Sequence, residues 1–106
     1  MSKKENNDGV VTLESGRKVE LNEMSIDDVD FCNDVTTYMY NEDGSSSIKG
    51  ISKARTTWLR RGIKGGDFNN FSLDGKFASD SVIRQLKDDE RNELMQKIQA
   101  YQQLGE

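Results

Sequence analysis

Residues 10–40 place a strand, a tight turn, a second strand and a capped amphipathic helix in direct succession, and this stretch constrains the fold more than any other. Apolar and polar residues alternate in VVTLE and again in RKVEL, on either side of Ser15 and Gly16. Alternation with a period of two predicts half-buried strands, and the Ser-Gly pair between them predicts a hairpin over 10–21. Because an isolated hairpin is barely stable in water, its apolar face is expected to pack on the helix that follows.

The helix predicted over 25–40 begins at a capping residue. The hydroxyl of Ser25 is placed to accept a backbone N–H of the first turn, and Asp27 and Asp28 suit the positive end of the helix dipole. Apolar residues then return every three or four positions, which is the spacing of a face that packs on a core. That face consists of Ile26, Val29, Cys32, Val35 and Met39.

The middle of the chain predicts a basic helix and then a long loop. The helix is expected over 52–61, where Trp58 falls on the apolar side and Gly62 stops the helix. Residues 62–78 contain four glycines and three phenylalanines. A segment so rich in both is expected either to fold back and insert its aromatic rings into the core, or to become ordered on a partner.

The two ends of the chain differ in character. Residues 1–9 are polar and are expected to form a flexible arm, whereas residues 80–104 are expected to form a helical C-terminus. The apolar face of that C-terminus consists of Leu94, Ile98 and Tyr101. Together these elements predict an α+β fold that is mainly α, with the N-terminal hairpin packed on a small bundle of three to four helices. A chain of 106 residues is expected to hold one such small domain, over 10–104.

Residue types that commonly carry chemistry are rare in this sequence. It contains no histidine and a single cysteine, Cys32. The commonest general base is therefore missing, and neither an intramolecular disulfide nor a thiolate-rich metal site can form. No catalytic, cofactor-binding or metal-binding residue is predicted, and an enzyme is the least expected class. An uncrosslinked chain without a long apolar stretch is expected in the cytoplasm rather than in a membrane.

Charge is distributed unevenly along the chain. Residues 20–43 hold eight acidic residues and no Lys or Arg, whereas residues 48–76 hold seven basic residues and two acidic ones. An acidic helix thus precedes a basic one. The two helices are expected either to neutralise each other in the fold or to present a surface of both signs to partners.

Eight residues of the first third form a pattern of strand pair and helix start. They are Leu13, Gly16, Arg17, Val19, Leu21, Met24, Ser25 and Asp28. A strand pair around Gly-[Arg/Lys], followed by Met/Leu-[Ser/Thr]-x-x-[Asp/Glu] at a helix start, resembles the opening of several families of small tail assembly chaperones of tailed bacteriophages. The remaining two thirds of the chain are similar to those proteins in size and character.

The resemblance implies a mostly helical protein of the host cytoplasm that has no active site. Such a protein binds the tape measure protein, and in some cases tail tube subunits, and keeps them in solution until the tube polymerises. The complementary charges of the two helices would also suit self-association. The partner-binding residues are expected on the apolar faces and at the basic end of the second helix; they are Ile26, Val29, Val35, Met39, Trp58, Arg60, Arg61, Leu94, Ile98 and Tyr101.

Two other functions stay open from the sequence. A structural component of the virion, such as a connector or a baseplate piece, would use the same apolar surfaces permanently. A small nucleic-acid-binding regulator would instead use the basic segment 49–64, in which an aromatic residue is interleaved with cations that can contact phosphates. The net charge of −4 weighs against that regulator. Its binding residues would be Lys53, Arg55, Arg60, Arg61 and Lys64.

Overall fold

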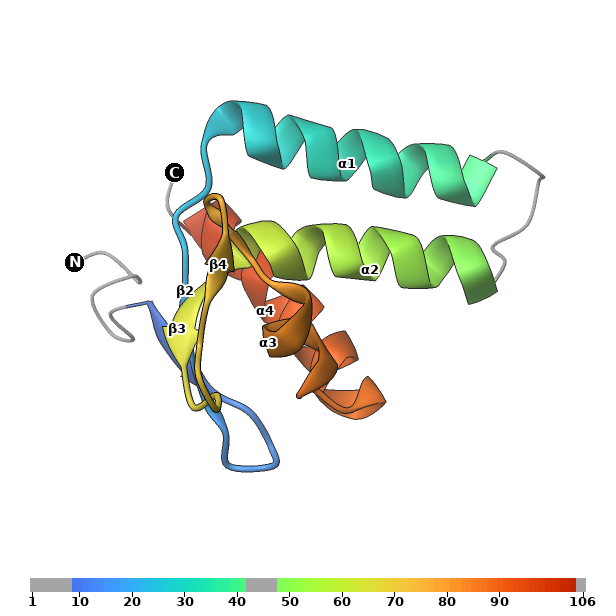
Figure 1. The fold of residues 1–106 in the computed structure, drawn as a ribbon. Helices are drawn as coiled ribbons and strands as arrows, with labels where there is room; N and C mark the ends of the chain where they lie inside the picture. The colour runs from blue at the N-terminus through green and yellow to red at the C-terminus, as the bar shows by residue number, and fades with distance from the viewer. Residues whose placement is uncertain (1–8, 42–47, 105–106) are drawn as a thin grey trace.

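The computed structural model describes residues 9–41 and 48–104, and it confirms an α+β fold with an N-terminal hairpin and four helices. Of the arm predicted over 1–9, only Gly9 belongs to the described residues. The strands lie to one side of the helices, and α1 and α2 lie side by side (Figure 1). In chain order the elements are β1 (Val10–Thr12), β2 (Lys18–Leu21), α1 (Ile26–Asn41), α2 (Ile48–Gly62), β3 (Ile63–Gly66), β4 (Leu73–Asp74), β5 (Phe77–Ala78), α3 (Asp80–Arg84) and α4 (Asp88–Leu104).

The predicted hairpin is formed by β1 and β2, which pair in antiparallel fashion with Val11 opposite Val19. Gly16 lies in the connecting turn with a φ of 95°, a conformation that glycine adopts without strain. The inward-facing residues Leu13, Val19 and Leu21 are buried, as the alternation of the sequence predicts.

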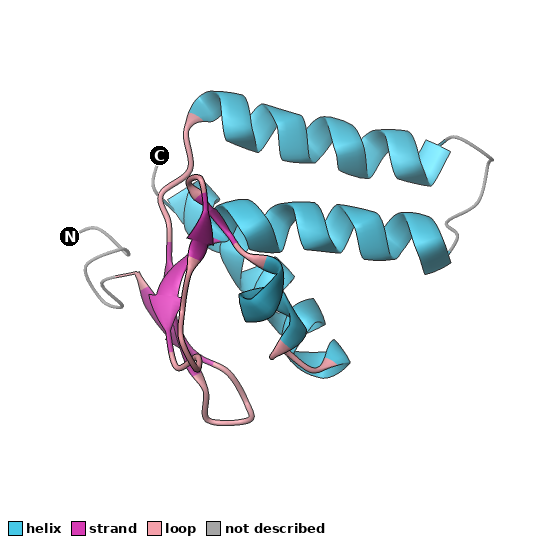
Figure 2. Cartoon of the chain, in the orientation of Figure 1, coloured by secondary structure: helices cyan, strands magenta, loops and turns pink. Residues whose placement is uncertain are grey.

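The predicted loop over 62–78 contains strands that the sequence analysis did not identify. β3 pairs antiparallel with β2 and completes a sheet with the order β1-β2-β3, whereas β4 and β5 form a separate hairpin (Figure 2). Glycine permits the β2–β3 pairing, because a Cβ on Gly66 would lie 2.5 Å from the carbonyl oxygen of Lys18. The pair Gly65-Gly66 has the local sequence pattern of a loop, but in the structure it lets the backbone of β3 lie close to that of β2.

The aromatic rings of the same segment follow the first of the two predicted alternatives. Phe68 and Phe71 are half-buried and pack against the core, with ring centroids 5.8 Å apart. Phe77 lies over Arg61 of α2. The segment therefore folds back on its own chain.

Helix α2 is the element on which the other long helices pack, since both α1 and α4 contact it. Helix α1 begins as predicted, with the backbone N–H of Asp28 donating to Oγ of Ser25 over 3.1 Å. Helix α2 begins at Ile48, before the predicted start at Ser52. Where α2 crosses α4, Gly62 allows close contact, because a Cβ there would lie 2.5 Å from Cγ2 of Ile98.

Candidate partner-binding groove

A groove of about 630 Å³ opens between the first half of α1 and the last turns of α4. Its apolar lining comes from Ile26 and Val29 of α1, from Met24 just before that helix, and from Trp58 of α2. Ile26 is 79% exposed, whereas Trp58 is only 3% exposed and forms the floor. The groove therefore exposes an apolar rim above a buried aromatic ring.

The polar lining of the groove is acidic or neutral. Glu23 and Asp30 supply carboxylates on the α1 side. The remaining polar residues carry amide side chains; they are Asn33, Gln99, Gln102 and Gln103. No Lys or Arg belongs to this lining among the residues that the structure describes.

Two sets of hydrogen bonds fix the shape of the groove. The backbone N–H of Met24 donates to Oε1 of Gln102, and Nε2 of Gln102 donates to the carbonyl oxygen of Asn22, both over 2.9 Å. These bonds join the segment before α1 to the end of α4. The indole N–H of Trp58 donates to Oγ1 of Thr36 over 3.1 Å and so holds the floor against α1. The groove is therefore preformed in the folded chain.

Three of the predicted partner-binding residues, Ile26, Val29 and Trp58, meet in this groove. Val35 is partly buried in α1 and does not line it. Met39 belongs to α1, but its side chain lies outside the described residues.

The predicted apolar face of the C-terminal helix requires a correction. Leu94, Ile98 and Tyr101 are 0%, 0% and 9% exposed and belong to the core. This face of α4 packs on α2, where Gly62 contacts Ile98. These three residues stabilise the fold and present no surface to a partner.

The arginines of the basic helix are engaged within the fold. Arg55 is 7% exposed and pairs with Asp88, with 3.0 Å between Nη2 and Oδ1. Arg60 pairs with Asp80, and the hydrogen bond and charge of Arg60 lower the pKa of that carboxyl. Asp88 belongs to α4 and Asp80 to α3, so these two arginines are neutralised by the C-terminal helices. Among the described residues, the predicted neutralisation of α2 by the acidic helix α1 is limited to the pair of Arg61 with Asp28.

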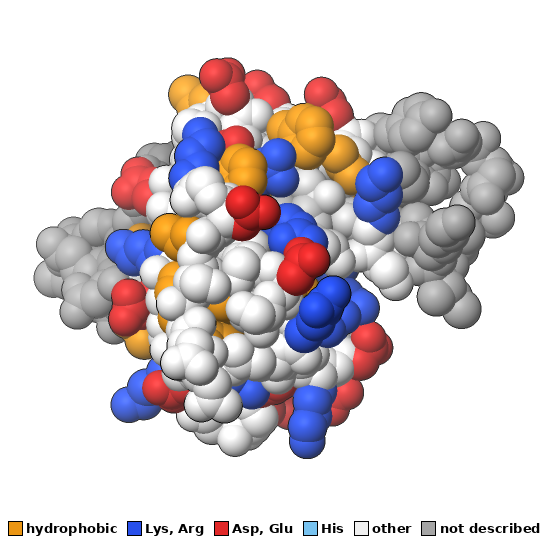
Figure 3. All heavy atoms as spheres, in the orientation of Figure 1, with side chains coloured by type: hydrophobic (Ala, Val, Ile, Leu, Met, Phe, Trp, Pro, Cys, Tyr) orange, Lys and Arg blue, Asp and Glu red, His pale blue; other side chains and the backbone are white. Residues whose placement is uncertain are grey.

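Arg61 connects three segments of the chain. Its guanidinium lies 4.4 Å from the ring centroids of both Phe31 and Phe77, and its Nε lies 3.5 Å from Oδ1 of Asp28. Lys53 and Lys64 are exposed. On the face drawn in Figure 3, basic and acidic side chains are interspersed, so this face carries no continuous basic patch.

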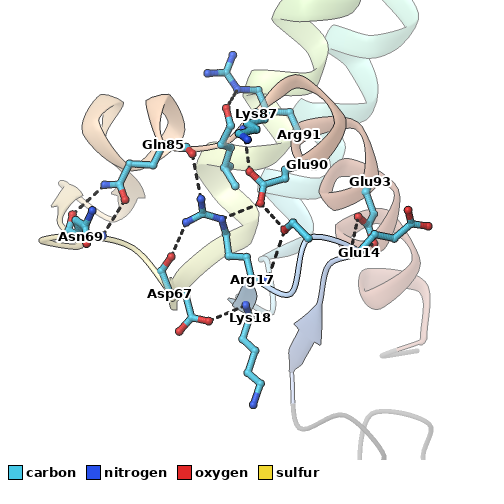
Figure 4. Close-up of polar contacts among 12 residues, drawn as sticks. Glu14, Arg17, Lys18, Asp67, Asn69, Gln85, Lys87, Glu90, Arg91 and Glu93 are labelled. Carbon is cyan, nitrogen blue, oxygen red and sulfur yellow. Dashed lines mark hydrogen bonds and ion pairs between the residues drawn. The ribbon is translucent and has the colours of Figure 1, made fainter.

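A polar cluster outside the groove joins the hairpin turn to the start of α4, with Arg17 at its centre (Figure 4). Arg17 donates to Glu90, to the carbonyl oxygen of Asp67 and to that of Gln85, and its guanidinium lies 5.2 Å from the ring centroid of Phe68. These hydrogen bonds join the hairpin turn to the segment after β3, to the end of α3 and to the first turn of α4. The cluster therefore holds the fold together.

Seven of the ten residues that line the groove were not predicted from the sequence; they are Met24 and the polar residues Glu23, Asp30, Asn33, Gln99, Gln102 and Gln103. Polar residues of this kind on a helix have the pattern of a solvated face. They line a groove because α1 and α4 both pack on α2, and no local pattern in the sequence encodes that arrangement.

No family model, curated protein or solved structure matches this chain significantly. Within residues 9–41 and 48–104, no helix combines the length and apolar character that crossing a membrane requires. The same residues contain no group of three or more His, Cys, Asp or Glu side chains suited to a metal ion.

Proposed function

We propose that this chain is a tail assembly chaperone of a tailed bacteriophage that binds the tape measure protein or tail tube subunits in the host cytoplasm. The observation that carries the proposal is the groove between α1 and α4, where Ile26, which is 79% exposed, and the half-buried Val29 lie above Trp58. Single exposed apolar residues are common on protein surfaces, but here the exposed Ile26 lies at a preformed groove that also presents carboxylate and amide groups, a combination typical of binding sites. The phage context comes from the resemblance of the first third of the sequence.

The ion pairs of α2 support a protein partner over a nucleic acid. Phosphate binding requires cations that are available at the surface. Arg55, Arg60 and Arg61 are instead held by Asp88, Asp80 and Asp28. A regulator that uses these three arginines would have to break the pairs before they contact phosphate, which leaves Lys53 and Lys64 as the exposed cations of the described part of segment 49–64.

Co-purification from infected cells tests the proposal. The tagged wild-type chain is expected to recover the tape measure protein or a tail tube protein, identified by mass spectrometry, whereas Ile26→Glu recovers at least tenfold less. The matched control is Leu73→Glu on the β4–β5 hairpin, because Leu73 is 48% exposed and does not line the groove. Variants of Trp58 and Ile98 are unsuitable, since both side chains are buried and their replacement would disrupt folding.

Two outcomes contradict the proposal. Finding the chain in stoichiometric amounts in purified virions would favour a structural component. Recovery of nucleic acid that is lost in Lys53→Glu and Lys64→Glu, with no tail protein recovered, would favour a regulator.

A further inference from the structure

We infer that the groove between α1 and α4 receives an amphipathic helix of the partner protein, in which basic side chains flank the apolar face. The inference rests on the proposed function to the extent that the partner is a protein. It adds the conformation of the bound segment and the sign of its charge.

The walls of the groove have the geometry that accepts a helix. On α1 the lining residues Ile26, Asp30 and Asn33 follow one another at intervals of four and three, and on α4 Gln99, Gln102 and Gln103 lie at i, i+3 and i+4. Both walls are therefore helical ridges, and the space between such ridges is filled in helical proteins by the side chains of another helix. From Ile26 to Asn33 the wall rises about 10 Å, which matches two turns of a bound helix, and apolar side chains at i, i+4 and i+7 of that helix would pack along the apolar lining of Ile26, Val29 and Trp58.

The charge of the groove selects a basic partner. Asp30 lines the groove, and Asp27 and Asp34 are exposed on the same helix. Among the described residues, no Lys or Arg forms an ion pair with any of these three carboxylates. In contrast, Asp28 on the inner side of α1 is paired with Arg61. The outer carboxylates of α1 therefore face a partner without internal neutralisation, and complementary charge favours Lys or Arg there.

A second copy of the chain is a poor source of the basic helix. Its own basic helix is α2, whose Arg55, Arg60 and Arg61 are engaged by carboxylates of the same chain. Trp58 and Leu59 on the apolar side of α2 are buried in the core. The complementary segment is therefore expected in another protein.

Selection from a displayed peptide library tests both parts of the inference. The library consists of 16-residue helical peptides randomised on one face, and the full-length chain is the bait. Enriched peptides are expected to carry large apolar residues at i, i+4 and i+7 with Lys or Arg beside them. The affinity of a synthetic copy without tryptophan is then followed through the fluorescence of Trp58, the single tryptophan of the chain, which lines the groove.

Surface variants locate the binding site. Ile26→Ser and Asp30→Lys are each expected to weaken binding at least tenfold, whereas the matched controls Leu73→Ser and Asp74→Lys change it less than twofold. All four side chains are exposed, so the variants are expected to keep the fold, which circular dichroism verifies. The controls repeat the loss of an apolar side chain and the reversal of a charge on the β4–β5 hairpin, away from the groove.

Three results of the peptide experiments would overturn the inference. They are the absence of enriched peptides, enrichment of peptides with acidic or uncharged flanks, and equal affinity for wild type and Asp30→Lys. A dimer in sedimentation equilibrium that dissociates in Ile26→Ser would identify a second copy as the occupant and would overturn it too.

The inference and the proposed function fail separately. If the library yields no basic helix but infected cells yield a tail protein, the inference is wrong and the function stands. If basic helices bind in the groove but no tail protein is recovered, the function is wrong and the inference stands.

Discussion

Arg17 beside the hairpin turn and Glu90 in the first turn of α4 form an ion pair, with 3.0 Å between Nε and Oε2. Glu90 also accepts a hydrogen bond from the hydroxyl of Ser15 over 2.7 Å and one from the backbone N–H of Lys87 over 2.9 Å (Figure 4). Its side chain is 7% exposed. One carboxylate thus caps α4 and ties the hairpin to it, because the bond to Lys87 satisfies an N–H that the helix leaves unpaired.

Replacing Glu90 with glutamine is expected to destabilise the fold by about 2 kcal/mol. The amide lacks the negative charge that strengthens the three hydrogen bonds. Its NH₂ group is itself a donor, and it would face the groups that donate to the carboxylate in the wild type. Urea unfolding followed by circular dichroism measures the loss. Asp89→Asn is the control, because Asp89 is exposed in the same first turn and shares the helix dipole; it should cost only about 0.5 kcal/mol. Equal losses in the two variants would assign the effect to the dipole alone.

The contribution of Glu90 is expected to vanish in acid. Burial opposes its ionisation, but the hydrogen bonds from Lys87, Ser15 and Arg17, together with the charge of Arg17, outweigh burial and lower its pKa from 4.5 to about 2. A carboxyl whose pKa is lower in the folded state stabilises the fold above the unfolded pKa and loses this effect as the pH falls through the folded one. The difference in unfolding free energy between wild type and Glu90→Gln should therefore be full at about pH 6 and decline from about pH 4.5 to pH 2. A difference that is independent of pH in this window would show that the charge of Glu90 is not its source.

The elements that local patterns determine were predictable from the sequence. The alternation around Ser15 and Gly16 gives the first hairpin, and the hydroxyl of Ser25 marks the start of α1. Strand β3 was not predictable in the same way. Its partner is β2, some 45 residues earlier in the chain, and Gly65 and Gly66 have the local signature of a loop.

The candidate site was predictable only in part, because an apolar periodicity marks a face without identifying what covers it. Ile26 and Leu94 both belong to such faces, yet Ile26 is 79% exposed and Leu94 is 0% exposed. The difference arises from the packing of α4 on α2, which buries one face, and from the position of α1 at the edge, which leaves part of the other open. Only the tertiary arrangement brings Ile26 and Gln102 to the same groove.

Gly62 and Ile98 are expected to be energetically coupled. A methyl group on Gly62 would lie 2.5 Å from Cγ2 and 2.7 Å from Cδ1 of Ile98, so Gly62→Ala should cost about 2 kcal/mol by overpacking. Ile98→Ala should cost about 3 kcal/mol by leaving a cavity. In the double variant the new methyl occupies part of that cavity, so the combined loss should fall at least about 1 kcal/mol short of the sum. Urea unfolding of the four chains provides the double-mutant cycle, and strict additivity would mean that α2 and α4 separate at Gly62 to relieve the clash.

The thiol of Cys32 is expected to be inert in the folded chain. Cys32 is 0% exposed between α1 and α2, and Sγ lies 3.8 Å from the carbonyl oxygen of Thr57. Burial raises its pKa from 9.0 to about 11, Arg61 opposes this rise, and Asp28 adds to it. Only the thiolate attacks thiol reagents, and a rise of two pKa units by itself lowers the thiolate fraction at pH 8 about 100-fold. Labelling with a chromogenic disulfide at pH 8 should therefore be at least about 100-fold slower in buffer than in concentrated urea, where the same chain is unfolded. Rapid labelling in buffer would instead mean that α1 separates readily from α2, and a groove whose wall is α1 would then not be preformed.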